Sequence, residues 1–299
     1  MPNGTATGGA VLDLPVRRER AQRGPSVRRN VTRALLWLVL AAGAAVMLFP
    51  FAWMISTSLK PDLGIFATPP QLIPHPFEPS NYSRVVHVFP VWRFLINSVI
   101  VGGISTTLQV ATSAMAAYAF ARMRFRGNNA LFLLYLATLM VPFQVTIVPL
   151  FIEMKYLGLI DSYPGLILPS IVSAFGTFFL RQAFLSLPKE LEEAAFMDGA
   201  SYWTVFTRIV LPLAKPTLAT FGIFAFMASW NSYLWPLVII SSTKLMTLPV
   251  GLASLQGEHF TAWNLVMAGT TISVIPIILV YLLAQKQIVR GVVLSGVKG

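Results

Sequence analysis

Six windows of the chain, each 19 to 28 residues long, contain no Asp, Glu, Lys or Arg. They cover residues 34–59, 94–121, 127–152, 162–180, 216–243 and 260–285. About 20 apolar residues of helix are enough to cross the ~30 Å hydrocarbon layer of a bilayer. Only 11% of the 299 residues are charged and 56% are hydrophobic, so a soluble globule of this size would lack polar cover. Because helices satisfy their own backbone hydrogen bonds in lipid, the windows predict an all-α membrane protein with six transmembrane helices.

The basic residues predict how these spans are oriented. Seven arginines precede the first window, and if the N-terminus is cytoplasmic, 17 of the 22 basic residues lie on the cytoplasmic side. This bias places both termini in the cytoplasm of a multi-pass protein of the cell (inner or plasma) membrane. The net charge of +11 is therefore explained by topology, and it does not indicate a nucleic-acid partner.

The segments between the windows differ in composition. Residues 1–33 are rich in Gly, Pro and Arg and predict a disordered cytoplasmic tail whose arginines contact anionic lipid. The first span, 34–59, is too long for a cleaved signal peptide and is expected to remain as an anchor. Residues 60–93 hold seven of the 21 prolines and predict an irregular extracytoplasmic loop. Residues 94–286 form the expected membrane core with the other five windows, and residues 287–299 are expected to be a cytoplasmic tail.

Metal and thiol chemistry find no support in the sequence. The chain has no cysteine and three histidines, His75, His87 and His259, which lack the spacing that places two ligands on one helical face. We therefore expect no metal site.

One polar connection, residues 188–212, is patterned as two short helices. Pro188 and a first turn containing Glu190, Glu192 and Glu193 predict a helix start. Gly199 predicts its end, and a second helix over 201–211 is expected to stop at Pro212. An amphipathic helix on the headgroups is the alternative. Anionic lipid would repel the acidic first turn, however, so a protein partner fits this segment better.

The same segment resembles the cytoplasmic loop of permeases from binding-protein-dependent ABC importers. That loop carries E-A-A, three residues, G, nine residues and I-x-L-P, and this chain has Glu193-Ala194-Ala195, Gly199 and Ile209-Val210-Leu211-Pro212 at the same spacings. Asp198 before Gly199, the Ser229-Trp230-Asn231 step and the tail ending in Lys298-Gly299 look like the carbohydrate-uptake, maltose-type branch.

The resemblance implies a type I importer permease fold with a cytoplasmic coupling helix. In that family the loop sits in a cleft of one subunit of a cytoplasmic ATPase dimer, a second homologous permease completes the pore, and an extracellular binding protein delivers the solute. The implied contacts to the ATPase are Glu193, Ala194, Ala195, Asp198, Gly199, Ile209, Leu211, Pro212 and Lys298. ATP and Mg²⁺ would be bound by the partner ATPase, because this chain has no G-x-x-x-x-G-K-[ST] motif. The chain itself would be no enzyme and hold no cofactor.

Polar residues inside the windows are candidates for the solute path. Gln144, Ser229, Asn231 and Tyr233 are the ones that we expect to contact solute, since buried polar groups in spans often face a cavity. Helix packing is the alternative role for such residues. The expected solute is a mono- to oligosaccharide, with glycerol phosphate or another polar solute as the alternative.

Two other classes of membrane protein would need ionisable groups within the spans. An ion-coupled secondary transporter normally needs an ionisable group within the membrane, and a membrane-embedded hydrolase needs a catalytic Asp or His there. All eleven acidic residues lie outside the six windows, which disfavours both classes. A purely structural membrane adaptor remains an alternative that a transport assay would expose.

Overall fold

The first helix begins before the charge-free window. The computed structural model describes residues 27–256 and 261–296, and α1 runs over Val27–Ser58. The helix thus starts seven residues before the predicted span at residue 34, because basic residues such as Arg33 are good helix formers and the hydrogen-bonded ladder continues through them. The rest of the predicted tail lies outside the described residues. The chain divides into two units, residues 1–51 and 52–299, which are described separately.

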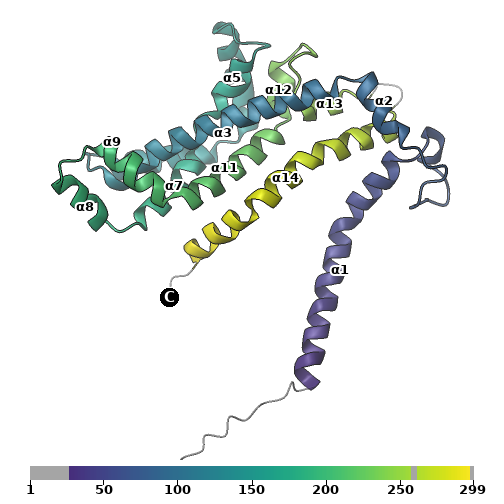
Figure 1. The fold of residues 1–299 in the computed structure, drawn as a ribbon. Coiled ribbons are helices and arrows are strands. Elements are labelled where there is room, and N and C mark those ends of the chain that lie inside the picture. The colour runs from purple at the N-terminus through teal and green to yellow at the C-terminus, as the bar shows by residue number, and fades with distance from the viewer. Residues whose placement is uncertain (1–26, 257–260, 297–299) are drawn as a thin grey trace, which may run out of the picture. The chain divides into compact units, whose positions relative to one another are not determined.

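Within the second unit, four helices form the core. They are α3 (Val91–Arg122), α7 (Ala174–Leu185), α11 (Lys215–Trp230) and α14 (Trp263–Gly296). The long helix α3 packs against α7 and α11, and α11 packs against α14 (Figure 1). The described elements are helical apart from one isolated bridge between Gln256 and Thr261, so the all-α expectation is confirmed.

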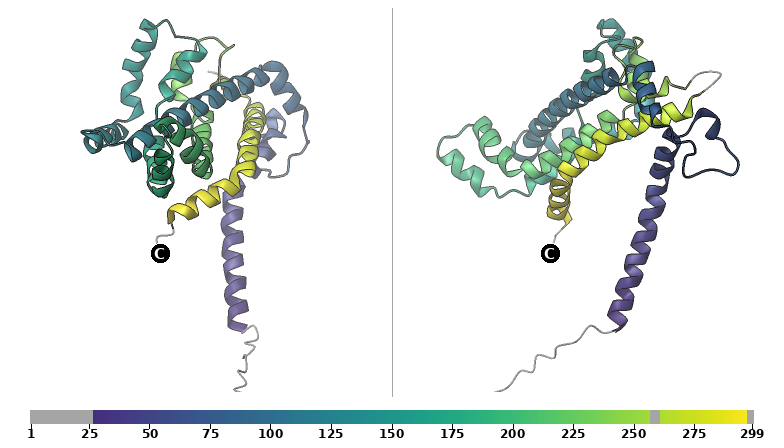
Figure 2. Two further views of the ribbon diagram at one scale, coloured as in Figure 1. Left: turned by 60° about the vertical axis from the view of Figure 1, so that its left-hand side comes forward. Right: turned by 45° about the vertical axis from the view of Figure 1, so that its right-hand side comes forward.

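The third predicted span, 127–152, is broken rather than continuous. α4 (Asn128–Ala137) and the 3-10 turn η2 (Thr138–Met140) meet α5 (Phe143–Tyr156) at 98°. Pro142 occupies the break, where it lacks the N–H that a continuous helix would need. α5 leaves the bundle on the side away from α14 (Figure 2).

The fourth and fifth predicted spans are also interrupted. α6 (Tyr163–Ile167) and η3 (Leu168–Ser170) meet α7 at 47°. Within the window 216–243, α11 stops at Trp230 and a separate short helix, α12 (Leu234–Ile239), follows. By length and composition, three described helices can cross a membrane, or up to six if three bent pairs each count as one span. Two of these pairs are the breaks at 98° and 47°, and the third joins residues 202–213 to α11 at 80°. The six transmembrane spans predicted from the sequence equal the upper limit of this count.

The last span is longer than predicted. α14 continues to Gly296, so most of the tail predicted at 287–299 is helical. The same propagation of backbone hydrogen bonds that extends α1 accounts for this. Lys298 lies outside the described residues.

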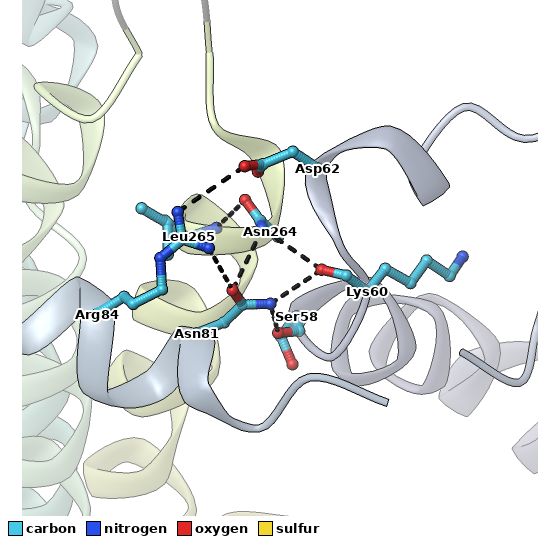
Figure 3. Close-up of polar contacts among 7 residues, drawn as sticks. All are labelled: Ser58, Lys60, Asp62, Asn81, Arg84, Asn264 and Leu265. Carbon is cyan, nitrogen blue, oxygen red and sulfur yellow. Dashed lines mark hydrogen bonds and ion pairs between the residues drawn. The ribbon is translucent and has the colours of Figure 1, made fainter. Parts of the chain in front are cut away.

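The predicted irregular loop at 60–93 contains helix and is pinned to the bundle. η1 (Asp62–Gly64) and α2 (Ser80–Val88) lie within it. The buried Asn81 donates through Nδ2 to the carbonyl oxygens of Ser58 (3.0 Å) and Lys60 (2.9 Å), as Figure 3 shows. Asn264 at the start of α14 donates to the Lys60 oxygen and to Asn81 Oδ1, each at 3.3 Å. Two buried amides therefore join the end of α1, α2 and α14.

Candidate coupling segment and solute cavities

The coupling segment, residues 188–212, begins with a helix that ends at a glycine. α8 covers Glu190–Met197. Gly199 has φ of 80°, which is costly for residues with a Cβ. The Gly199 N–H donates to the Phe196 oxygen at 3.0 Å and the Ala200 N–H to the Ala195 oxygen at 2.9 Å, the pair of bonds of a Schellman motif. The predicted glycine stop is confirmed.

The second half of the segment is longer and less regular than predicted. Ser201 caps α9 (Tyr202–Val205) by accepting from the Thr204 N–H at 3.2 Å. A π-helical turn over Phe206–Val210 leads into α10 (Leu211–Leu213). Pro212 therefore does not end the helix. The wide π turn shifts the hydrogen-bond register just before the proline, so its missing N–H and its ring are tolerated.

A buried ion pair fastens the segment to the bundle. Arg122, the last residue of α3, places its Nε 2.8 Å from Glu192 Oε1, with both side chains almost fully buried. The same guanidinium donates to the carbonyl oxygens of Phe184 (2.7 Å) and Leu187 (2.8 Å). Burial raises the pKa of the Glu192 carboxyl, and the positive charges of Arg122 and Lys189 oppose that rise.

The acidic first turn of α8 is only partly exposed. Glu190 and Glu193 are exposed as expected for that turn, whereas Glu192 is buried. Arg122 and Glu192 are remote in sequence and share no local pattern, so no signal in a single sequence links them.

The motif residues separate into an exposed and an inward group. Glu193, Ala194, Asp198 and Gly199 are exposed, whereas Ala195, Ile209 and Leu211 pack on a core cluster that includes Phe184 and Val210. Pro212 is exposed beside them. The structure therefore brings the two ends of the motif into one protrusion beyond the end of α3 (Figure 1). Contact of these residues with an ATPase stays a prediction.

Large apolar side chains cover the tip of this protrusion. Met197 is 88% exposed, Trp203 is 64% exposed and Tyr202 is 54% exposed. Phe196 meets the Tyr202 ring edge-on at 5.0 Å between centroids. Apolar side chains gathered at the tip of a polar segment are typical of a surface that a protein partner covers.

Two cavities contain most of the residues predicted for the solute path. Asn231 and Tyr233 line a cavity of about 410 Å³ between the end of α11, α13 (Leu248–Ala253) and α14. Ser229 lines another, of about 300 Å³, with Gln109 and Ser232. Gln144 is exposed on α5 and lines neither cavity. The structure thus groups Asn231 with Tyr233 but separates them from Ser229 and Gln144.

Both cavities are mostly apolar and are lined by some polar side chains but by no charged ones. The first is lined by Trp230, Asn231, Tyr233, Leu248, Pro249, Leu252, Ala253, Gln256, Val266, Thr270, Ser273, Val274 and Ile277. Amides, hydroxyls and aromatic rings line it, and none of these described residues is ionisable at neutral pH. Thr270 and Ser273 were among the polar residues of the last window, and their hydroxyls donate to carbonyl oxygens of their own helix.

A bent-helix membrane core with a protruding two-helix segment defines a transport permease of the importer type. Residues 109–294 match the family described as "Binding-protein-dependent transport system inner membrane component", and the chain belongs to that family. It is a permease subunit of a binding-protein-dependent ABC importer.

Relatives and solved structures agree with this assignment. The chain is 35% identical over 282 residues to "Arabinooligosaccharides transport system permease protein AraQ" of Halalkalibacterium halodurans, covering 91% of this chain and 100% of that one. It is 38% identical over 263 residues to "sn-glycerol-3-phosphate transport system permease protein UgpE" of Salmonella typhimurium, covering 85% and 94%. A chain of a bacterial ABC transporter "involved in the import of the acidic polysaccharide alginate" superposes with a TM-score of 0.77 at 26% identity, covering 87% and 98%.

Proposed function

We propose that this permease carries a neutral carbohydrate, from a mono- to an oligosaccharide, that an extracellular binding protein delivers. A second homologous permease completes the pore, and a cytoplasmic ATPase dimer, which binds ATP and Mg²⁺, drives the cycle. Both termini lie in the cytoplasm. The observation that carries the proposal is the coupling segment, because it presents an exposed tip on a base fixed by a buried ion pair.

The geometry of the segment suits the transmission of force. Its tip exposes Met197 and Trp203, while Arg122 and Glu192 hold its base against α3. A partner that grips the tip therefore pulls on α3 rather than on a loose loop. Ile209 and Leu211 pack on the core cluster that includes Phe184, and these contacts fix the second half of the segment to the bundle.

The uncharged cavities favour a neutral solute. Trp230 and Tyr233 provide aromatic faces, and Asn231 and Gln256 provide amides, in a cavity large enough for one sugar ring. Stacking on aromatic rings and hydrogen bonds to amides are a common way to bind a hydroxylated ligand in a mostly apolar pocket. The name of the arabinooligosaccharide relative is consistent with this class.

Glycerol phosphate is the second candidate, because a relative that is 38% identical is named for its transport. A phosphate dianion is normally held by Arg, Lys or backbone N–H groups. Neither cavity has a cationic side chain among its described lining residues, so the neutral solute takes precedence.

The coupling role is tested in the transporter assembled with its partners in proteoliposomes. Glu193→Lys reverses an exposed charge on α8. Gly199→Pro forbids the positive φ that residue 199 adopts in the elbow, which is the turn between α8 and α9. Both variants should insert normally and hydrolyse ATP without solute-stimulated uptake. Glu153→Lys changes another exposed carboxylate, on α5, and is the matched control that should transport normally. Normal coupled uptake in Glu193→Lys and Gly199→Pro would contradict the proposal.

The solute class is tested separately. Asn231→Ala and Tyr233→Ala should reduce uptake of the carbohydrate by about tenfold or more while ATP-driven conformational change persists, because each removes a polar or aromatic contact. Gln144→Ala, outside the cavities, is the control. If the assembled transporter takes up glycerol phosphate and does not take up sugars, glycerol phosphate replaces carbohydrate as the proposed solute.

A further inference from the structure

A basic cleft lies beside the base of the coupling segment, and the function proposed above does not use its unpaired arginines. It has a volume of about 680 Å³. Its charged lining residues are Arg122, Arg124, Arg126, Arg181, Lys189, Glu192 and Glu193. Since Arg122 and Glu192 neutralise each other, four cations face the cleft against the single carboxylate of Glu193. The cleft is therefore suited to an anion.

Its cationic groups are partly held in place. Arg181 donates through Nε to the Phe120 oxygen at 3.2 Å, and its guanidinium lies 4.2 Å from the centroid of the Phe132 ring. Arg124 and Arg126 follow the end of α3, are exposed, and form no ion pair with any residue in the described part of the chain. One fixed and two unpaired arginines thus border the same space.

An apolar groove adjoins this cleft. The groove has a volume of about 610 Å³ and is lined by Thr112, Ala116, Phe120, Leu131, Leu134, Tyr135, Thr138 and Val172. Phe120 belongs to both linings, so the cleft and the groove meet at its side chain. Leu131 and Leu134 on α4 are 50% and 68% exposed along the groove. A charged recess next to an apolar groove matches the two-part chemistry of a phospholipid.

We propose that the cleft and groove together bind one anionic phospholipid. Its phosphate lies against Arg124 and Arg126, and one acyl chain runs between α3 and α4 past Phe120. Basic pockets beside membrane helices are known to hold anionic headgroups. Free phosphate or an acidic protein segment would use the cleft alone and leave the adjoining groove unexplained. Because Lys189 and Glu193 also border the cleft, the bound headgroup contacts the base of α8.

The test uses the purified transporter with its partner subunits, stripped of lipid in mild detergent. Native mass spectrometry follows the binding of phosphatidylglycerol, with phosphatidylcholine of the same acyl chains as the headgroup control. The double variant Arg124→Gln/Arg126→Gln should bind phosphatidylglycerol at least about tenfold more weakly, since each basic side chain near a phosphate contributes several-fold. Arg93→Gln/Lys155→Gln removes the same charge from exposed sites elsewhere and should bind as the wild type does.

Two further arms separate the sources of the anion. Leu134→Gln makes the groove polar and should also weaken phosphatidylglycerol binding, which a site for free phosphate would not show. Inorganic phosphate should not displace the lipid at comparable concentration. Equal phosphatidylglycerol binding in all variants overturns the proposal, as does full competition by inorganic phosphate. Loss of the ATPase subunit from Arg124→Gln/Arg126→Gln also overturns it, because the cleft would then be a protein-docking site.

Discussion

The Nε atom of Arg122 and the Oε1 atom of Glu192 lie 2.8 Å apart and join the last turn of α3 to the first turn of α8. A buried pair of this kind gains little net stability, because desolvation offsets the Coulomb attraction, but removing one partner leaves an uncompensated charge. The main effect of the ion pair is therefore to fix the orientation of α8 relative to α3. α3 has 32 residues and is about 48 Å long, so a displacement at α8 reaches the opposite end of the bundle through one helix.

Breaking this ion pair should loosen the coupling segment. Arg122→Met strands the buried Glu192 carboxylate, and the local cost is about 3–5 kcal/mol. We expect faster hydrogen exchange across α8 and a lower melting temperature. The double variant Arg122→Met/Glu192→Met should recover much of the loss, and Glu190→Gln, an exposed neighbour, should have little effect. Glu192→Gln should lower the melting temperature and speed hydrogen exchange in α8 more than Glu190→Gln does. Equal changes in the two variants would contradict the structural role of the pair.

Close packing of α7 on α11 depends on Gly176. A Cβ at this position would lie 2.1 Å from Phe221 Cζ, inside the bundle core. Gly176→Ala should therefore destabilise the protein by about 1–3 kcal/mol through overpacking, measured as a lower melting temperature in detergent. Gly103→Ala on α3, where nothing lies within 4 Å, is the control. Partial rescue of Gly176→Ala by Phe221→Leu would identify the ring as the clash, and absence of any loss would refute it.

Acid should release a contact between two loops. Asp161 Oδ1 accepts from the Ser241 N–H (3.1 Å), the Ser242 N–H (3.0 Å) and the Ser242 hydroxyl (3.0 Å). The Ser242 backbone bond is the main cause that holds the pKa of the Asp161 carboxyl below its ordinary 3.8. The stabilisation is therefore complete above pH 3.8 and is lost as the pH falls through the lower folded-state pKa.

Hydrogen exchange at the Ser241 and Ser242 amides, corrected for intrinsic rates, measures this release. Protection should persist through pH 4 and fall below it. Asp161→Asn keeps an acceptor and tolerates the φ of 54°, so it should show weaker protection without the acid transition. A transition that persists in Asp161→Asn would assign it to another group.

The hydrogen bonds of Asn81 and Asn264, at the end of the bundle away from Arg122, should hold residues 60–79 in place. Asn81 bonds to Ser58, Lys60, Arg84 and Asn264 while fully buried. Asn81→Leu removes a donor from the Ser58 and Lys60 carbonyl oxygens, which should lower the free energy of unfolding by about 1–3 kcal/mol. Limited proteolysis within residues 60–79 should then be faster. Ser83→Ala, exposed on the same helix, should leave the cleavage rate unchanged. Equal cleavage rates in the two variants would count against the network.

Sequence patterns located the apolar segments and the coupling segment because both depend on local periodicity. The absence of charge over 94–121 predicted most of α3, and Gly199 predicted the elbow because only its missing Cβ permits φ of 80° at low cost. The third span was predicted as a single segment over 127–152, and the structure breaks it at Pro142 with an angle of 98°. That angle depends on how α4 and α5 pack, which no local pattern encodes.

The remaining features required tertiary structure. Whether Glu192 faces water or Arg122 depends on how α8 folds back on α3, and both orientations satisfy the same helical pattern. Similarly, Asn231 and Ser229 are two residues apart, yet they line different cavities because α11 ends between them at Trp230. Gln144 resembled them only in being polar within an apolar window.

The most direct test of the coupling role is site-specific cross-linking in the purified, assembled transporter. A photo-reactive residue at Met197, 88% exposed at the tip of the coupling segment, is compared with the same residue at Met140, 83% exposed in η2. The account predicts an adduct to the ATPase subunit from position 197, with a yield that changes when ATP binds, and none from position 140. No ATPase adduct from position 197, or equal adducts from both positions, would contradict it.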